Sequence, residues 1–169
     1  MAGMPRRRAL LIVAAIAVLV VALDQGSKAW ARRDLAPGHE VTVIPGWLWF
    51  RLASNTGATL GLGTGRNELF AALALIIVVA ILVLALRGDV GGVLGIAALG
   101  IVAGGAVGNL VDRVRLGGVT DFIEVHFWPT DFNLADAAIR FGVVLLLLAL
   151  LLDWTGRRGH ARLGTGRKG

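Results

Sequence analysis

Carboxylate and amide side chains gather in one stretch of the chain, residues 104–142. Asn109 and Asp112 are three residues apart, and Asn133 and Asp136 repeat this spacing. Residues three apart share one face of a helix, so each pair would point in one direction if its segment is helical. Such groups are costly at membrane depth, which makes them functional candidates wherever the surrounding chain is apolar.

Asp121 lies between these pairs, in a β-branched run typical of a strand. Two carboxyls within reach of one water cannot both ionise readily, so they share a proton. The ionised member can take a proton from the water, while the protonated member stabilises a carbonyl oxygen. The spacing alone also fits structural roles, such as a helix cap at Asp136 or an ion pair of Asp112 with Arg113 or Arg115.

Metal binding is a weaker interpretation of the same region. Glu124 and His126 alternate with Asp121, but mixed ligands without a firm spacing are a poor signal. A solvated strand face explains these side chains better. The chain has no cysteine, which excludes disulfides, thiol catalysis and thiolate metal sites.

The polar residues lie within and between long apolar segments, which must form the elements that position them. Only 17% of the 169 residues are charged, against about 25% in soluble domains. Blocks of this length and composition are typical of membrane spans. We predict four transmembrane helices, at about residues 9–29, 68–87, 90–111 and 136–153. The third carries Gly100, Gly104 and Gly108 on one face, which favours close helix packing.

The first span must include charged residues. Its apolar block, residues 9–23, would rise about 22 Å as a helix, and a hydrocarbon core is about 30 Å thick. The helix should therefore continue through Asp24 and Lys28, which could pair with each other or form only a surface ion pair. Because these charges follow the apolar block, a cleaved signal peptide is a poor alternative.

Basic residues predict the topology. They precede the first span, lie between the second and third, and follow the fourth, so four spans place them all on one side, the cytoplasm. Residues 1–155 would form one membrane domain with both termini inside, and 156–169 a disordered basic cytoplasmic tail. The net charge of +6 then reflects topology and lipid contacts instead of nucleic acid.

The two longer connections, residues 30–66 and 112–135, would face outward with the acidic groups. The first holds two β-branched or aromatic runs, 41–44 and 47–52, about a Pro45-Gly46 turn. This pattern predicts an extracytoplasmic β-hairpin. Its aromatic side chains could simply anchor the loop at the lipid headgroups.

Five motifs in this order resemble the lipoprotein signal peptidases (signal peptidase II), a family of aspartic membrane proteases. They are DQxxK, a NxGAAFG-like run, GNxxDR, VVDF and FNxAD, at residues 24–28, 55–61, 104–113, 118–123 and 132–136. Together they cover nearly the whole chain between its tails.

The resemblance implies an enzyme of the bacterial inner membrane that cuts diacylglyceryl-modified prolipoproteins before the lipidated cysteine. Its catalytic pair would be Asp121 and Asp136, at the outer face. The residues that would shape the site or hold substrate are Asp24, Lys28, Asn55, Gly57, Asn109, Asp112, Arg113 and Asn133. Four helices with a small β-cradle, no metal or organic cofactor, contact with membrane lipids and a monomeric state are the further expectations.

The chain also departs from the family pattern. The segment from Asp121 to Asp136 is short, and Arg140 follows Asp136 by one helical turn. Arg140 could face Asp136 and favour its ionised form, or extend toward the lipid headgroups, which we expect. Two other functions stay open from the residues themselves: a small transporter or channel subunit that uses the aspartates as a proton or cation pathway, and a structural or assembly subunit.

Overall fold

The computed structural model describes residues 4–36, 38–57, 65–87 and 90–165, with side chains up to Gly156. The helices are α1 (Arg6–Asp34), α2 (Asn67–Arg87), α3 (Gly92–Leu116) and α4 (Leu134–Thr165). The strands are β1 (Glu40–Ile44), β2 (Leu48–Asn55) and β3 (Val119–Val125). All four helices are long and apolar enough to cross a membrane, so the predicted fold class is confirmed.

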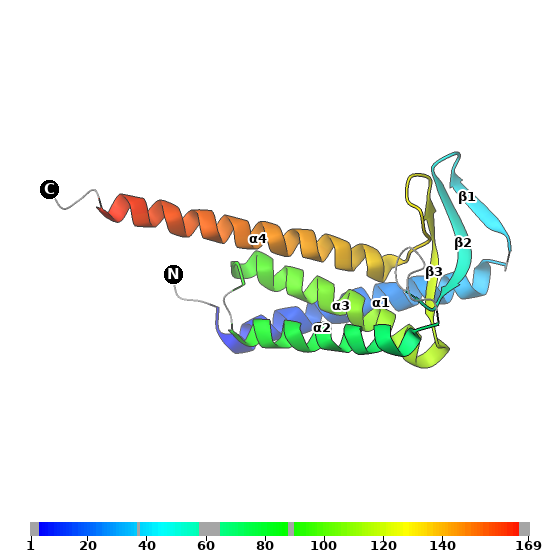
Figure 1. Cartoon of the computed structure of the whole chain (residues 1–169), viewed down its shortest axis with the longest axis horizontal. Helices are drawn as coiled ribbons and strands as arrows, with labels where there is room; N and C mark the ends of the chain where they lie inside the picture. The colour runs from blue at the N-terminus through cyan, green and yellow to red at the C-terminus, as the bar shows by residue number, and fades with distance from the viewer. Residues whose placement is uncertain (1–3, 37, 58–64, 88–89, 166–169) are drawn as a thin grey trace.

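The helices run side by side and the sheet covers one end of the bundle (Figure 1). The start of α1 and the end of α4 lie at the opposite end. The carboxyl ends of α1 and α3 and the amino end of α4 therefore meet beneath the sheet. Chemistry-bearing residues from separate parts of the chain can converge there.

Small residues place α3 at the centre of the bundle. In its most apolar stretch 67% of the residues are buried, against 17% in each of the other helices. A Cβ at Gly100 would lie 2.8 Å from the Cβ of Ile16, and one at Gly104 only 2.6 Å from the Cβ of Val20. The predicted glycine face thus brings α3 against α1, where only hydrogen fits.

Large apolar side chains face away from this centre. Ile76 of α2 is 63% exposed and Val144 of α4 is 65% exposed. A helix that is apolar on its outer face is stable in lipid, where exposed aliphatic groups meet hydrocarbon instead of water. The exposed apolar surface therefore agrees with a protein of the membrane.

The predicted hairpin is confirmed, and β3 extends it to a three-stranded antiparallel sheet in the order β1-β2-β3. The β2–β3 register pairs Asn55 with Val119 and Ala53 with Asp121, which brings the Asn55 end of β2 beside Asp121. Trp30 of α1 contacts Phe50 and Phe122 edge to face, with ring centroids 5.5 and 6.1 Å apart, and so joins α1 to the sheet.

One prediction about the carboxyl end was wrong. The tail was expected to be disordered from Gly156, but α4 continues to Thr165. Alanine, leucine and arginine in this segment are good helix formers, and they outweigh its glycines. Residues 166–169 of that tail and residues 58–61 of the NxGAAFG-like motif lie outside the described residues.

The α1–α3 contact makes a matched pair of glycine substitutions informative. Gly104→Val should lower the stability by about 1–3 kcal/mol, because the side chain must displace Val20. Gly26→Ala, where no heavy atom lies within 4 Å of the added Cβ, should be neutral or stabilising. Thermal unfolding in detergent measures both, and equal midpoints would contradict the close approach of the helices.

Candidate active site

Seven polar or charged side chains of the described residues are buried, and they belong to the carboxyl halves of α1 and α3, to β3 and to the residue before α4. They are Asp24, Lys28, Asn109, Asp112, Thr120, Asp121 and Asn133. A buried charge is tolerated only when it is paired and hydrogen-bonded. The contacts of this cluster therefore show whether each buried polar group has the partners that it needs.

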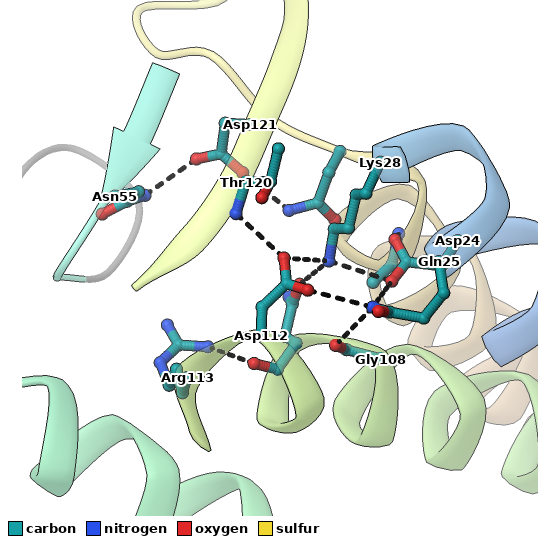
Figure 2. Close-up of polar contacts among 12 residues, drawn as sticks. Asp24, Gln25, Lys28, Asn55, Gly108, Asp112, Arg113, Thr120 and Asp121 are labelled. Carbon is teal, nitrogen blue, oxygen red and sulfur yellow. Dashed lines mark hydrogen bonds and ion pairs between the residues drawn. The ribbon is translucent and has the colours of Figure 1, made fainter. Parts of the chain in front are cut away.

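Lys28 is the centre of the cluster (Figure 2). Its Nζ lies 2.9 Å from Asp24, 3.3 Å from Asp112 and 2.8 Å from Asn109 Oδ1. An ammonium group has three N–H donors, so each has an acceptor here. The Asp24–Lys28 pair is fully buried, which rules out the plain surface ion pair.

Asp24 also joins α1 to α4. Its Oδ1 accepts a hydrogen bond of 2.9 Å from the backbone N–H of Ala135. This amide belongs to the first turn of α4, where N–H groups lack partners within the helix and favour a negative charge. Gly108 makes room for the carboxylate, since a Cβ there would lie 2.5 Å from Asp24 Oδ2.

Asp112 fixes β3 against the helices. Its Oδ2 accepts 3.0 Å from the N–H of Thr120, and its partners Lys28 and Arg32 lie on α1. The alternative pairing with a neighbouring arginine of α3 does not occur among the contacts of Asp112. Asp112 therefore determines how the strand that carries Asp121 sits on the bundle.

Asp121 and Asp136 meet through Asn133. Asn133 Nδ2 donates to Asp121 Oδ1 at 2.6 Å, and Asn133 Oδ1 accepts from the N–H of Asp136 at 2.9 Å. The second bond makes Asn133 the N-cap of α4. Asp136 Oδ1 accepts 2.7 Å from Asn109 Nδ2, and Asp121 Oδ2 accepts 3.0 Å from Asn55 Nδ2.

Burial and the charge of Asp136 raise the pKa of Asp121 to about 6. The side chain is 2% exposed, so its ionised form loses most of its hydration. The amide donors Asn55 and Asn133 and the charge of Lys28 oppose the shift, because they stabilise the carboxylate. Asp121 is thus the kind of carboxyl that can hold a proton near neutral pH.

Two cavities open on the two aspartates. The outer pocket, about 380 Å³, lies between β2, β3 and the loop 126–133, and its polar lining includes Arg51, Asp121, Glu124, Thr130 and Asp131. The membrane pocket, about 360 Å³, lies between α2, α3 and α4, and its lining includes Phe70, Ala106, Arg113, Asp136 and Ile139. Asn55 lines both, so the pockets meet beside the aspartates.

Arg113 and Gly57 complete the group of predicted site residues. Arg113 Nη2 donates to Gly57 O at 3.1 Å, and the Gly57 N–H donates to Asn55 Oδ1 at 2.9 Å. The structure thus brings all ten predicted site residues together. Within the described residues, no group of three His, Cys, Asp or Glu could hold a metal ion.

Sequence analysis missed Gln25 and Arg32. Gln25 Nε2 lies 3.1 Å from oxygens of Asp24, Asp112 and Gly108, and Arg32 donates 2.8 Å to Thr120. Gln25 belongs to the quoted DQxxK motif, so its position was the available signal. Nothing in the spacing links Arg32, one turn after Lys28, with β3.

Arg140 and Asp136 both line the membrane pocket. The Arg140 guanidinium lies over the rings of Trp128 and Phe132, 4.8 and 5.3 Å from their centroids. Both rings belong to the loop between β3 and α4. Arg140 therefore stabilises this short loop by cation–π contacts, and its extension toward the lipid headgroups stays a prediction.

Lys28 should dominate the stability of this region. Lys28→Met leaves Asp24 and Asp112 buried without their cation, which should cost about 3–5 kcal/mol. Adding Asp24→Asn and Asp112→Asn should restore part of the loss. Denaturant unfolding in detergent checks this, with Arg33→Met, whose side chain is 78% exposed, as a control that leaves the midpoint unchanged. A Lys28→Met midpoint equal to that of the parent would contradict the central role.

Comparison with known proteins assigns the family. Residues 16–152 match the family model described as signal peptidase (SPase) II. The chain is 41% identical over 136 residues to the lipoprotein signal peptidase of Syntrophomonas wolfei, covering 80% of this chain and 90% of that protein. It is 45% identical over 142 residues to that of Pseudomonas paraeruginosa, covering 79% and 83%.

A solved structure agrees with this assignment. The chain superposes on a bacterial membrane enzyme solved by the in meso method at 2.3 Å resolution, with a TM-score of 0.79 and 32% identity, covering 85% of this chain and 90% of that one. The sequence match spans every described helix and strand at least in part. The chain therefore belongs to the signal peptidase II family of membrane peptidases.

Proposed function

We propose that this peptidase is an aspartic endopeptidase that removes the signal peptide from diacylglyceryl-modified prolipoproteins, cutting before the lipidated cysteine. The observation that carries the proposal is the joining of Asp121 and Asp136 through Asn133, at the place where a polar and an apolar pocket meet. Two carboxyls around one water are sufficient for peptide hydrolysis.

In this mechanism Asp121 holds the shared proton and Asp136 acts as the general base. Lys28 donates to Asn109, and Asn109 donates to Asp136, so the amide relays a positive charge to this carboxylate. Asp121, with its raised pKa, holds the shared proton and hydrogen-bonds the carbonyl oxygen. Asp136 takes a proton as the water oxygen bonds to the carbonyl carbon, then passes it to the departing nitrogen as the C–N bond breaks.

The two pockets support this choice of substrate. The signal segment and the acyl chains are apolar, and the membrane pocket offers them Phe70, Ala106 and Ile139 between helices. Water reaches Asp121 from the polar outer pocket. Basic residues at the other end of the bundle support cytoplasmic termini and an active site at the outer face of the bacterial membrane.

Ion transport has less support. A proton or cation path needs polar groups along the whole bundle. The buried polar side chains of the described helices all lie at the sheet end, and the other end is packed by Ala9, Val13, Ile81 and Leu99. The carboxylates therefore form a local cluster instead of a transmembrane line.

Asp121→Asn and Asp136→Asn should each reduce cleavage of a lipidated prolipoprotein peptide by about a thousandfold or more. Each change removes a proton donor or acceptor while it keeps the shape of the side chain. Asp34→Asn, at a carboxylate that is 40% exposed at the end of α1, is the matched control and should keep full activity. Substantial turnover by either purified active-site variant would refute the catalytic assignment.

The pH dependence tests which carboxyl holds the proton. Because the pKa of Asp121 is raised to about 6, the pair loses its shared proton above this pH, and kcat/KM should fall as pH rises through it. Asn55→Ala removes a donor that stabilises ionised Asp121, so it should raise this pKa and move the alkaline limb to higher pH.

Asn67→Ala is the control for this experiment, because Asn67 donates to the backbone of Arg113 and not to Asp121. It should leave the alkaline limb in place. An Asn55→Ala profile with an unmoved limb, or one moved to lower pH, would reject Asp121 as the proton-bearing member.

A further inference from the structure

The outer pocket has an excess of negative charge. Arg51 Nη2 lies 3.0 Å from both carboxylate oxygens of Asp131 and 3.4 Å from Glu124 Oε2. One guanidinium thus faces two carboxylates, and Asp121 at the base of the pocket adds a third acidic group. The fixed charges of the lining favour a cationic or neutral occupant over an anionic one.

Two polar atoms of this pocket lack hydrogen-bond partners. Glu124 Oε2 and Thr130 Oγ1 are buried atoms without one, although Arg51 lies within ion-pair distance of the former. An unsatisfied buried polar atom is costly and suggests that a group absent from the free protein completes it. The N–H groups of an extended peptide or a basic side chain would supply such donors.

The position of the pocket relates it to the two aspartates and to the membrane spans. It opens on Asp121, is formed by the sheet and the loop 126–133, and lies beyond the membrane spans. The membrane pocket opens on Asp136 and is largely apolar. A prolipoprotein held across both aspartates would leave its apolar signal segment and acyl chains on the membrane side, and its polar mature chain on the outer side.

We propose that the outer pocket binds the first residues of the mature polypeptide, after the lipidated cysteine, and that Glu124 makes the enzyme discriminate against acidic side chains there. This inference rests on the proposed function. Arg51 and Asp131 neutralise each other, since their contact uses both carboxylate oxygens, and Glu124 is left as the surplus charge. Asp131 belongs to the segment between β3 and α4.

Solvent limits the size of the effect. The side chains of Arg51 and Glu124 are 45% and 31% exposed, so water screens their charges. We expect a peptide with lysine to have a kcat/KM about fivefold higher than one with glutamate at the same position, as is usual for a partly exposed charge. A neutral glutamine should give an intermediate value.

The experiment uses the full-length enzyme in detergent and diacylglyceryl peptides that share one signal sequence. Lysine, glutamine or glutamate is placed in turn at each of the first three positions after the cysteine, and kcat/KM is measured. At the position that reaches Glu124, the parent should prefer lysine about fivefold. Glu124→Gln and Asp131→Asn each leave Arg51 facing a single carboxylate, so each should bring the ratio close to one.

Ratios between peptides cancel any loss of folded enzyme in a variant. Asp34→Asn, outside the pocket, should keep the parental ratio. Equal cleavage of all peptides by the parent, or a preference that survives Glu124→Gln, would overturn the inference while the proposed function stands. Failure to cleave even the glutamine peptides would instead count against the proposed function, and the inference would fall with it.

Discussion

The ammonium group of Lys28 needs three acceptors at a depth where water is scarce, and the chain supplies them from two helices. Asp24 lies on the same helix, and Asp112 and Asn109 lie on α3. Each acceptor has a second partner: Ala135 for Asp24, Thr120 for Asp112 and Asp136 for Asn109. A single cation therefore determines how α1, α3, α4 and β3 meet.

This arrangement explains why the most costly groups of the protein lie together. A lone aspartate at the end of a membrane span would be neutralised or expelled toward water. Here the carboxylates are stabilised by the partly positive N-terminus of α4, by the Lys28 ammonium and by several amide donors. Burial and the charge of Asp136 raise the pKa of Asp121 to about 6, although two amide donors and the charge of Lys28 oppose the shift. The network stabilises the fold and leaves the Asp121 carboxyl able to exchange a proton near neutral pH.

Much of this could be predicted from the sequence, because its physics is local. Continuous apolar blocks predict the spans, and the 41–44 and 47–52 runs about a Pro-Gly turn predict the hairpin. Convergence of Asp121 with Asp136 required the family resemblance, since spacing left structural roles open. The Arg140 contacts with Trp128 and Phe132, and the Arg51–Asp131 pair, depend on the path of one short loop. No periodicity in the sequence encodes that path.

The helix bundle is stabilised by apolar packing along most of its length and by polar contacts at its sheet end. In the part of α3 up to Gly104, stability comes from close contact of small residues with α1, as at Gly100 and Gly104, and no buried polar side chain of the described residues interrupts it. At the sheet end, a glycine makes room for a charged group, because the absence of a Cβ at Gly108 lets the Asp24 carboxylate approach α3. One glycine-rich helix thus supports tight apolar packing along most of its length and a charged site at its end. Since both depend on the same α1–α3 approach, a change that separates these helices should disturb the site even where it touches none of the acidic residues.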